Sequence, residues 1–227
     1  NRLDFYPKHA ISEWNRKLED YLDGRINLEE LKNSLARPRL LVKVKVVSRD
    51  LTFEPIGGGD NGKLWKALEK LKQMWGDPDI PTEPLPPYGS RGMGGDIKTI
   101  IWGLDKWYKH FNSRQLLTLV KLVKLIREVG KKVEEEKLKE GWSEEKAFKY
   151  AEAVTTYLAI ALTRYLNFGN YANTWNPGSW AKSKVRGGGV FATRGISMTW
   201  NWVDISPIKD PMYSLEGCVN TQLEALS

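Results

Sequence analysis

The sequence predicts a helix-rich α+β protein. Three observations predict this class: apolar residues recur at helical spacing in several windows, one window alternates valine with lysine, and Pro and Gly cluster between helical windows. With 227 residues, 41% of them hydrophobic, the chain can bury a substantial core. We expect a small N-terminal α+β unit, a Pro/Gly-rich connection, a pair of long helices and a Trp/Gly-rich irregular or β segment, over residues 1–75, 76–111, 112–169 and 170–227.

The N-terminal unit opens with two helical windows. Residues 9–23 place their apolar side chains on one helical face, and Gly24 ends this run. Asn27 can accept the first free N–H groups of a second, short helix over residues 28–35. A helix, a turn and a shorter helix are therefore expected.

A strand pattern and a third helix complete this unit. From Leu40 onwards valine alternates with lysine, which predicts a strand with one solvated face, and residues 51–53 are expected to pair with it as a hairpin. Helical spacing returns over residues 60–75, with Asp60 or Asn61 as the expected N-cap.

The connection and the helix pair differ sharply in composition. Residues 76–98 hold five prolines and five glycines, which predicts irregular chain at the periphery. A long helix follows from residue 112 or 113, and Ser143 caps a second that runs to about residue 166. Because the second helix is apolar around most of its circumference, it is predicted to be buried at the centre.

Positive charge is concentrated in residues 91–132. This stretch has ten Lys/Arg and three acidic residues, and 10 − 3 = +7 equals the formal net charge of the whole chain. The sequence pI near 9.3 favours a polyanionic partner, because lysine and arginine gain affinity by releasing counterions from phosphates. A solvated, lysine-rich surface of a heat-stable protein explains the charge equally well.

Three runs in this region carry a family resemblance. They are Gly-Ser-Arg-Gly-Met-Gly at 89–94, Trp-Gly-Leu-Asp-Lys-Trp at 102–107 and Phe-Asn-Ser-Arg-Gln-Leu-Leu at 111–117. Together they resemble the prokaryotic adenine-specific DNA methylases whose long central insert includes a zinc ribbon. The resemblance extends over most of the chain, through residues 40–55, 65–72, 147–162, 198–202 and 214–217.

The resemblance implies a segment of such a methylase. The family's Gly-rich S-adenosylmethionine loop and its catalytic Asp-Pro-Pro-Tyr tetrapeptide are both missing from this sequence. We therefore expect an internal fragment of a DNA adenine-N6 methyltransferase of the restriction-modification type. It would be the DNA target-recognition or DNA-contacting insert, inactive alone and without a cofactor of its own. Its expected partners are DNA and the remainder of the methylase. The alternative is a structural helical insert or a protein-interaction module that makes no nucleic-acid contact.

Two short motifs approach functional sequences without matching them. Residues 85–88 read Leu-Pro-Pro-Tyr, and leucine cannot accept the hydrogen bond that a methylase needs from the adenine amino group. Residues 57–63 are rich in glycine, but they lack the spacing of a phosphate loop and have Leu64 where its hydroxyl would stand. We interpret residues 85–88 as irregular chain and residues 57–63 as the segment that leads into a helix.

The cysteine and histidine content and the hydropathy of the chain predict its cellular compartment and bear on disulfide and zinc sites. A single cysteine, Cys218, excludes an internal disulfide, and with only His9 and His110 a zinc site is not expected. No apolar run approaches the roughly 20 residues of a membrane span, and no secretory segment is recognisable. A cytoplasmic protein without a membrane partner is predicted.

Two regions have the composition of a nucleic-acid contact. Arg114 and Gln115 lie in the first turn of a long helix, where N–H groups favour an anion, although Arg114 could instead pair with Asp105 or Glu128. Residues 175–202 mix Trp with Lys and Arg, which suits stacking beside a phosphate track, although the tryptophans could equally be core. The predicted DNA-contacting residues are Arg91, Arg114, Gln115, Lys121, Lys124, Arg127, Trp175, Trp180, Lys182, Lys184, Arg186 and Arg194.

Overall fold

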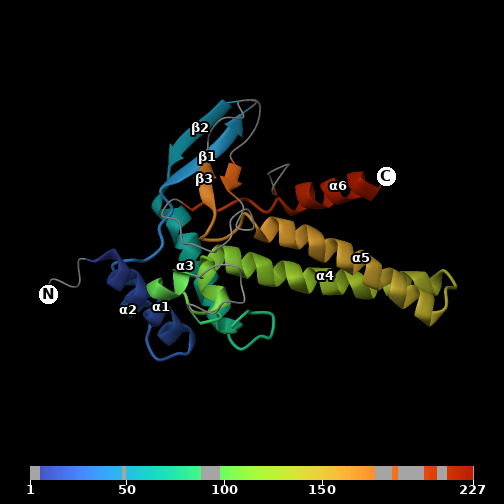
Figure 1. Ribbon diagram of the computed structural model, residues 1–227, viewed down its shortest axis with the longest axis horizontal. Helices are drawn as coiled ribbons and strands as arrows, with labels where there is room; N and C mark the ends of the chain where they lie inside the picture. Colours follow the sequence, from blue (N-terminus) through green and yellow to red (C-terminus); the bar gives the residue numbers. More distant parts are fainter. Residues whose placement is uncertain are drawn as a thin grey trace. The chain divides into compact units, whose positions relative to one another are not determined.

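The chain has a helix-rich α+β fold, as predicted (Figure 1). The structure is a computed structural model that describes residues 6–47, 50–87, 98–176, 186–188, 202–208 and 214–226. Two compact units form, one from Asn1–Leu117 with Asn170–Val203 and the other from Thr118–Gly169 with Asp204–Ser227; we name them unit 1 and unit 2. This grouping joins residues that are distant in sequence, and the four predicted segments stay a prediction.

Unit 1 begins with the two expected helices. Helix α1 spans Pro7–Leu22, and the chain leaves it through Gly24 at a φ of 82°, a left-handed conformation that glycine adopts without strain. Helix α2 spans Leu28–Lys32, shorter than predicted, and the side chain of Asn27 caps it by accepting a hydrogen bond from the N–H of Glu30 at 2.9 Å.

Strands β1 (Val42–Val47) and β2 (Asp50–Pro55) form the predicted antiparallel hairpin. The following helix, α3, spans Gly58–Gln73 and has Gly57 at its N-cap position, so the predicted caps were wrong. Asn61 instead exchanges two hydrogen bonds with the backbone of Leu40, which joins the helix to the segment before β1.

Asp60 has a related role in the first turn of α3. It pairs with Lys63 at 3.0 Å and with Lys43 of β1 at 3.2 Å, and these hydrogen bonds, that of Lys63 first, lower the pKa of Asp60 to about 2. The glycine-rich motif therefore begins a helix.

The described part of the proline-rich connection, residues 76–87, is irregular, as predicted, but it is not peripheral. Leu85 is only 6% exposed, and its N–H donates to the carbonyl oxygen of Asp105 at 2.8 Å. An isolated bridge joins Pro84 to Lys106. These backbone bonds tie the connection to the short segment between two 3-10 helices, η3 (Lys98–Trp102) and η4 (Trp107–His110).

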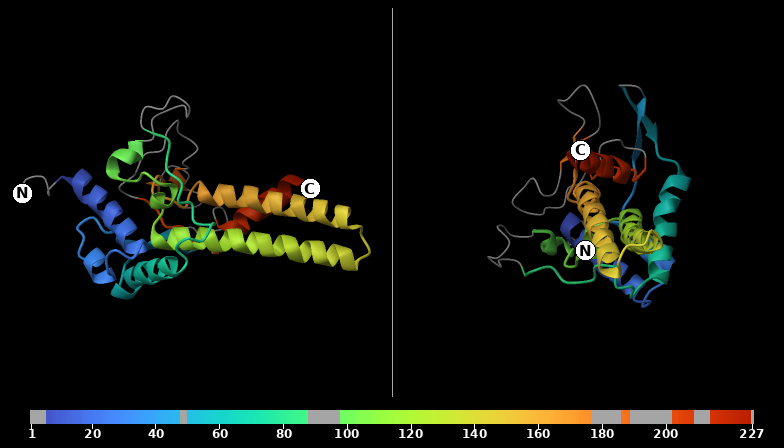
Figure 2. Two further views of the ribbon diagram at one scale, coloured as in Figure 1. Left: turned by 90° about the horizontal axis from the view of Figure 1, so that it is seen from below. Right: turned by 90° about the vertical axis from the view of Figure 1, so that its right-hand side faces the viewer.

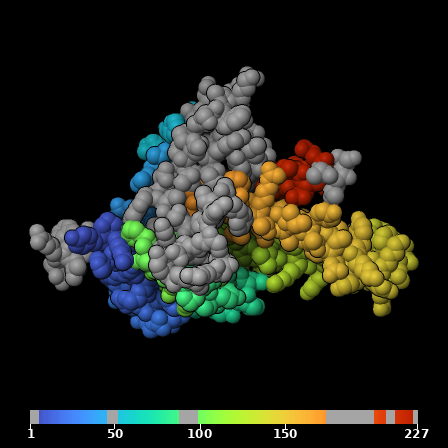
Figure 3. Space-filling model, in the orientation of Figure 1, coloured from blue at the N-terminus to red at the C-terminus, as the bar shows by residue number. Residues whose placement is uncertain are grey.

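The long helices are α4, Ser113–Lys139, and α5, Glu144–Leu166, and they run antiparallel (Figures 1 and 2). As predicted, Ser143 caps α5 by accepting a hydrogen bond from the N–H of Lys146. The two helices approach closely at Gly130, where an added Cβ would lie 2.7 Å from a methyl group of Thr155. Their connection, yellow in Figure 3, lies at the surface.

The prediction that α5 is buried around its circumference was wrong. Ala147, Ala151, Ala161 and Tyr165 form its buried stripe, whereas Leu158 is only partly buried. Large apolar side chains elsewhere on the helix are exposed, namely Phe148, Tyr150, Tyr157 and Ile160. The helix therefore has one internal face and a second apolar face towards solvent.

The C-terminal segment contains a helix that was not predicted. Short strands β3 (Thr174–Asn176) and β4 (Arg186–Gly188) pair antiparallel in unit 1, which agrees with the expected β content. Helix α6 spans Leu215–Leu226 in unit 2 and packs on α5. Ser214 accepts a hydrogen bond from the N–H of Gly217 at 3.1 Å, the geometry of an N-cap.

Candidate nucleic-acid interface

Helix α4 has a row of basic side chains on one face. Lys121, Lys124, Arg127 and Lys131 follow one another at intervals of three or four residues, which places them on one side of a helix. Lys121, Arg127 and Lys131 are exposed, and Lys124 is half-buried. We name these four residues the basic stripe. They include three of the predicted DNA contacts and all belong to unit 2.

The apolar side of the same helix explains why this row faces solvent. Leu119 is 8% exposed, and Gly130, about three helical turns further along the same side, packs against α5. Since this side is fixed in the interior, the basic positions are directed outwards. Glu128 is the one acidic residue between Lys121 and Lys131, so the stripe keeps a net positive charge.

Gln115 has a structural role at the start of α4. Its side-chain oxygen accepts a hydrogen bond from the N–H of Asn112, and the side chain of Asn112 accepts one from the N–H of Gln115, each at 2.9 Å. The Gln115 amide also donates to the carbonyl oxygen of Val203 at 3.1 Å, and the residue is 2% exposed. This arrangement is a capping box, in which both polar ends of Gln115 bind the protein itself.

This capping box was not predicted, although its signal is present in the sequence. An Asn followed three residues later by Gln, ahead of a long apolar run, is its expected signature. Arg114, the neighbouring predicted contact, is half-buried, and the side chain of Asn112 also accepts a hydrogen bond from its N–H. Of the two residues, only Arg114 is partly exposed.

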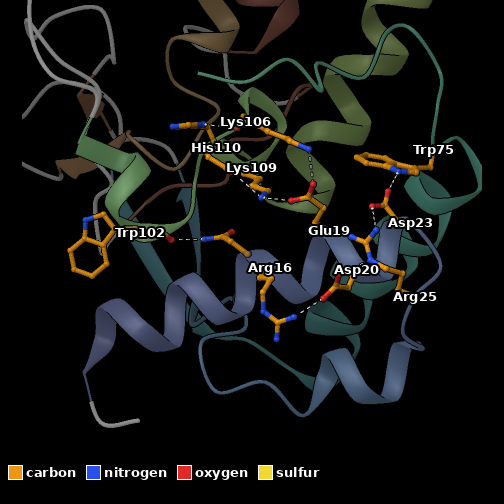
Figure 4. A network of polar contacts seen from close by, with 12 residues as sticks. Arg16, Glu19, Asp20, Asp23, Arg25, Trp75, Trp102, Lys106, Lys109 and His110 are labelled. Carbon is orange, nitrogen blue, oxygen red and sulfur yellow. Dashed lines mark hydrogen bonds and ion pairs between the residues drawn. The ribbon is translucent and has the colours of Figure 1, made fainter. Parts of the chain in front are cut away.

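Two other lysines of the charged stretch are neutralised inside unit 1. Lys106 and Lys109 both bind the carboxylate of Glu19, at 2.6 and 2.7 Å (Figure 4). Lys109 also pairs with Asp105 at 2.7 Å, and its side chain is only 3% exposed. Residues about 90 positions apart thus form a partly buried ion cluster, and these lysines are not placed to bind an external anion.

The pKa of Glu19 reflects this cluster. Burial alone raises the pKa of the carboxyl group, but the hydrogen bonds from Lys106 and Lys109 outweigh burial, and the net result is a lowered pKa. Glu19 therefore stays ionised between its two lysine partners. The sequence analysis did not identify this residue, because no local pattern links α1 to η4.

His110 lies beside the cluster and is 4% exposed. Its Nε2 is 2.9 Å from the hydroxyl of Thr99, and its Nδ1 is 3.3 Å from the carbonyl oxygen of Lys106. Burial lowers the pKa of His110 to about 4, so the ring is neutral at physiological pH. It acts as an internal hydrogen-bonding group between η3 and η4.

A small cavity of about 40 Å³ lies next to this cluster and is lined on its polar side by Tyr108 and Asn112. The Tyr108 hydroxyl and the Asn112 Nδ2 are buried without a hydrogen-bond partner in the described part of the chain. The volume accommodates about three water molecules. We therefore assign it to the hydrated interior of unit 1.

The other predicted contacts lie wholly or partly outside the described residues. Trp175 and Arg186 belong to β3 and β4, whose backbone register pairs Trp175 with Gly187 and Asn176 with Arg186. Only their backbone positions are described. The predicted contacts outside the described residues are Arg91, Trp180, Lys182, Lys184 and Arg194.

Two other classes of site are missing from the described residues. In the described ranges, no three or more His, Cys, Asp or Glu side chains are grouped so that they could hold a metal ion. Among those same residues, no helix combines the length and the apolar character needed to cross a membrane.

Comparison with protein-family models, curated proteins and solved structures found no match.

Proposed function

We propose that the chain is a DNA-contacting segment, non-catalytic alone, of an S-adenosylmethionine-dependent DNA adenine-N6 methyltransferase in the cytoplasm. The observation that supports DNA contact is the basic stripe on α4. The methyltransferase assignment rests on the sequence resemblance, and S-adenosylmethionine would bind to the remainder of such a protein. This chain would then hold the substrate without transferring a methyl group.

The stripe suits contacts to the phosphate backbone. From Lys121 to Lys131 an α-helix rises by roughly 15 Å, which spans several phosphates of one DNA strand. Lysine and arginine bound to phosphates fix the position of a duplex but carry no direct sequence information. The expected interaction is therefore weak, salt-dependent and similar for all sequences.

The test is a salt titration of duplex binding by fluorescence anisotropy. In the variant Lys121→Gln, Lys124→Gln, Arg127→Gln, affinity at low salt should fall at least about tenfold. Each lost phosphate contact makes the negative slope of log K against log salt shallower by about 0.9. The magnitude of the slope should therefore decrease by about 2 to 3. The loss should be the same for unrelated DNA sequences.

A matched control removes the same charge from elsewhere in unit 2. The variant Lys139→Gln, Lys146→Gln, Lys149→Gln also loses three positive charges from exposed positions. Its slope of log K against log salt should differ from the wild-type slope by no more than about 0.9, the contribution of one phosphate contact. Equal losses in both variants would mean that only net charge matters, and absence of binding at low salt would reject DNA contact.

The second candidate function is a protein-interaction insert that packs against the remainder of the methylase. The exposed apolar face of α5 favours it, because Tyr150, Tyr157 and Ile160 lie seven and three residues apart and are each between 43% and 46% exposed. This candidate predicts no DNA binding at any salt concentration. The same titration therefore separates the two functions.

A further inference from the structure

Unit 1 contains a second cavity, of about 240 Å³, that the basic stripe does not line. Its aromatic walls come from three distant parts of the chain, Trp14 in α1, Tyr171 after α5, and Trp202. The rings of Tyr171 and Trp202 meet edge to face, with centroids 5.1 Å apart and an interplanar angle of 69°. We name this cavity the aromatic pocket.

The size of the aromatic pocket limits what it can bind. A volume of 240 Å³ is far above the roughly 15 Å³ that holds one water molecule. It is somewhat below the range of about 300 to 1,000 Å³ that is typical of drug-sized ligands. One planar ring system fits this size. Aromatic side chains stack on the ring of any nucleic-acid base, because every base has a π-face.

A buried amide supplies a hydrogen-bonding group in the wall. Asn15 is 4% exposed, and its Nδ2 donates to the carbonyl oxygen of Trp102 at 3.0 Å, which fixes the orientation of the amide. Within the described part of the chain, its Oδ1 accepts no hydrogen bond. This oxygen can accept a hydrogen bond from an amino group on a bound ring.

Two arginines line the same pocket. Arg39 is exposed, so the pocket reaches the protein surface, and Arg37 is half-buried and donates to the carbonyl oxygen of Ser34 at 3.1 Å. In the residues that the structure describes, neither arginine forms an ion pair with a carboxylate. Guanidinium groups bind phosphate through paired N–H donors, so this edge is suited to an anion.

We propose that the aromatic pocket binds one unpaired nucleotide, with its base against the aromatic walls and its phosphate on Arg37 and Arg39. The inference rests on the proposed function, because it names the part of the nucleic acid that unit 1 recognises. The acceptor on Asn15 favours bases that have an exocyclic amino group, such as adenine, over thymine, which has none.

The test compares three duplexes that differ at one bulged position: an unpaired adenine, an unpaired thymine or an abasic site. Since base stacking on aromatic side chains contributes on the order of 1 to 3 kcal/mol, the adenine bulge should bind at least about fivefold tighter than the abasic bulge. Thymine should fall between them. Equal affinities for the adenine and abasic bulges would overturn the proposal.

Variants locate the effect in the pocket. Trp202→Leu, which removes an aromatic wall, should reduce the preference for the adenine bulge over the abasic bulge. Arg39→Gln, which removes a phosphate partner, should weaken binding of the adenine bulge itself. Trp142→Leu, in unit 2, should do neither. Circular dichroism checks folding, and Arg39→Gln, an exposed change, carries the test if Trp202→Leu does not fold. In folded protein, an adenine preference that survives Trp202→Leu, or adenine-bulge binding that Arg39→Gln leaves unchanged, would also overturn the proposal.

The failures of the two proposals are distinguishable. Neutralising the basic stripe should weaken all three duplexes by the same factor and leave their ratios unchanged. If no duplex binds, the proposed function fails, and titration with deoxyadenosine monophosphate then tests the pocket alone. Saturable quenching of tryptophan fluorescence below about 10 mM that Arg39→Gln weakens supports the pocket, and absence of saturation rejects it.

Discussion

Two groups of basic residues, close in sequence, are used in opposite ways. Lys106 and Lys109 are bound to Glu19 and Asp105, and Lys109 is almost fully buried. The basic stripe on α4, which begins at Lys121, faces solvent along a helix whose other side is packed. Equal charge in the sequence thus becomes an internal ion cluster in one case and a row of basic side chains at the surface in the other. What separates them is burial: Lys109 is 3% exposed, whereas Lys121, Arg127 and Lys131 are exposed.

The largest expected effect concerns His110, which lies beside the internal group and is 4% exposed. Its pKa is about 4 in the folded protein and about 6.5 when unfolded, so the unfolded chain binds more protons between these values. The stability that this difference gives is fully present above pH 6.5 and is lost as the pH falls to 4. The expected loss is about 3 kcal/mol.

Urea denaturation of wild-type protein and of His110→Gln across pH 7 to 4 measures this effect. Glutamine cannot titrate, so the pH dependence in this window should become shallow. Glu19, whose pKa is lowered, contributes its loss at lower pH, below its unfolded value of about 4.3. A wild-type profile that is flat from pH 6.5 to 4 would show that His110 is not buried as described.

Glu19→Ala should have the next largest effect, because it removes one of the two carboxylates that bind the buried Lys109. Breaking a buried ion pair costs about 3 to 5 kcal/mol, and since Asp105 remains we expect about 2 to 3 kcal/mol. The matched control on the same helix is Glu13→Ala, an exposed partner of Lys17, with an expected change within about 0.5 kcal/mol.

A double variant sharpens this prediction. Adding Lys109→Met to Glu19→Ala removes the unpaired buried charge, so part of the lost stability should return. Similar losses for Glu19→Ala and Glu13→Ala in urea denaturation would show that Lys109 is hydrated, and the contrast between the internal lysines and the basic stripe would then disappear.

Much of unit 1 could be predicted because its signals are local. Gly24 ends a helix through its own backbone conformation, Asn27 caps the next helix three residues ahead, and the Val/Lys alternation sets a hairpin register. Each signal lies within a few residues of the structure that it determines. The helix-rich α+β class follows from these elements together with the long apolar windows.

Predictions that depended on distant partners were less successful. Leu85 is buried because Asp105, twenty residues later, binds its backbone, and α5 exposes Tyr157 because the described residues leave part of its apolar circumference uncovered. Composition predicted the reverse in both cases. The candidate site divides in the same way: helical spacing places the basic stripe on one face, but no local pattern joins Glu19 to Lys109.

The smallest expected effect is that of Lys121→Gln on the free energy of unfolding. The sign of this change is more informative than its size. On the helix its near charged neighbour is Lys124, three residues on, and like charges at this spacing destabilise a helix by a few tenths of a kcal/mol. Glutamine has nearly the helix propensity of lysine. Lys121→Gln should therefore raise the free energy of unfolding by about 0.3 kcal/mol. Lys63→Gln, which loses an ion pair with Asp60, should lower it slightly. If Lys121→Gln instead lowers stability by more than about 1 kcal/mol, Lys121 has a partner within the protein, and the basic stripe belongs with the internal lysines.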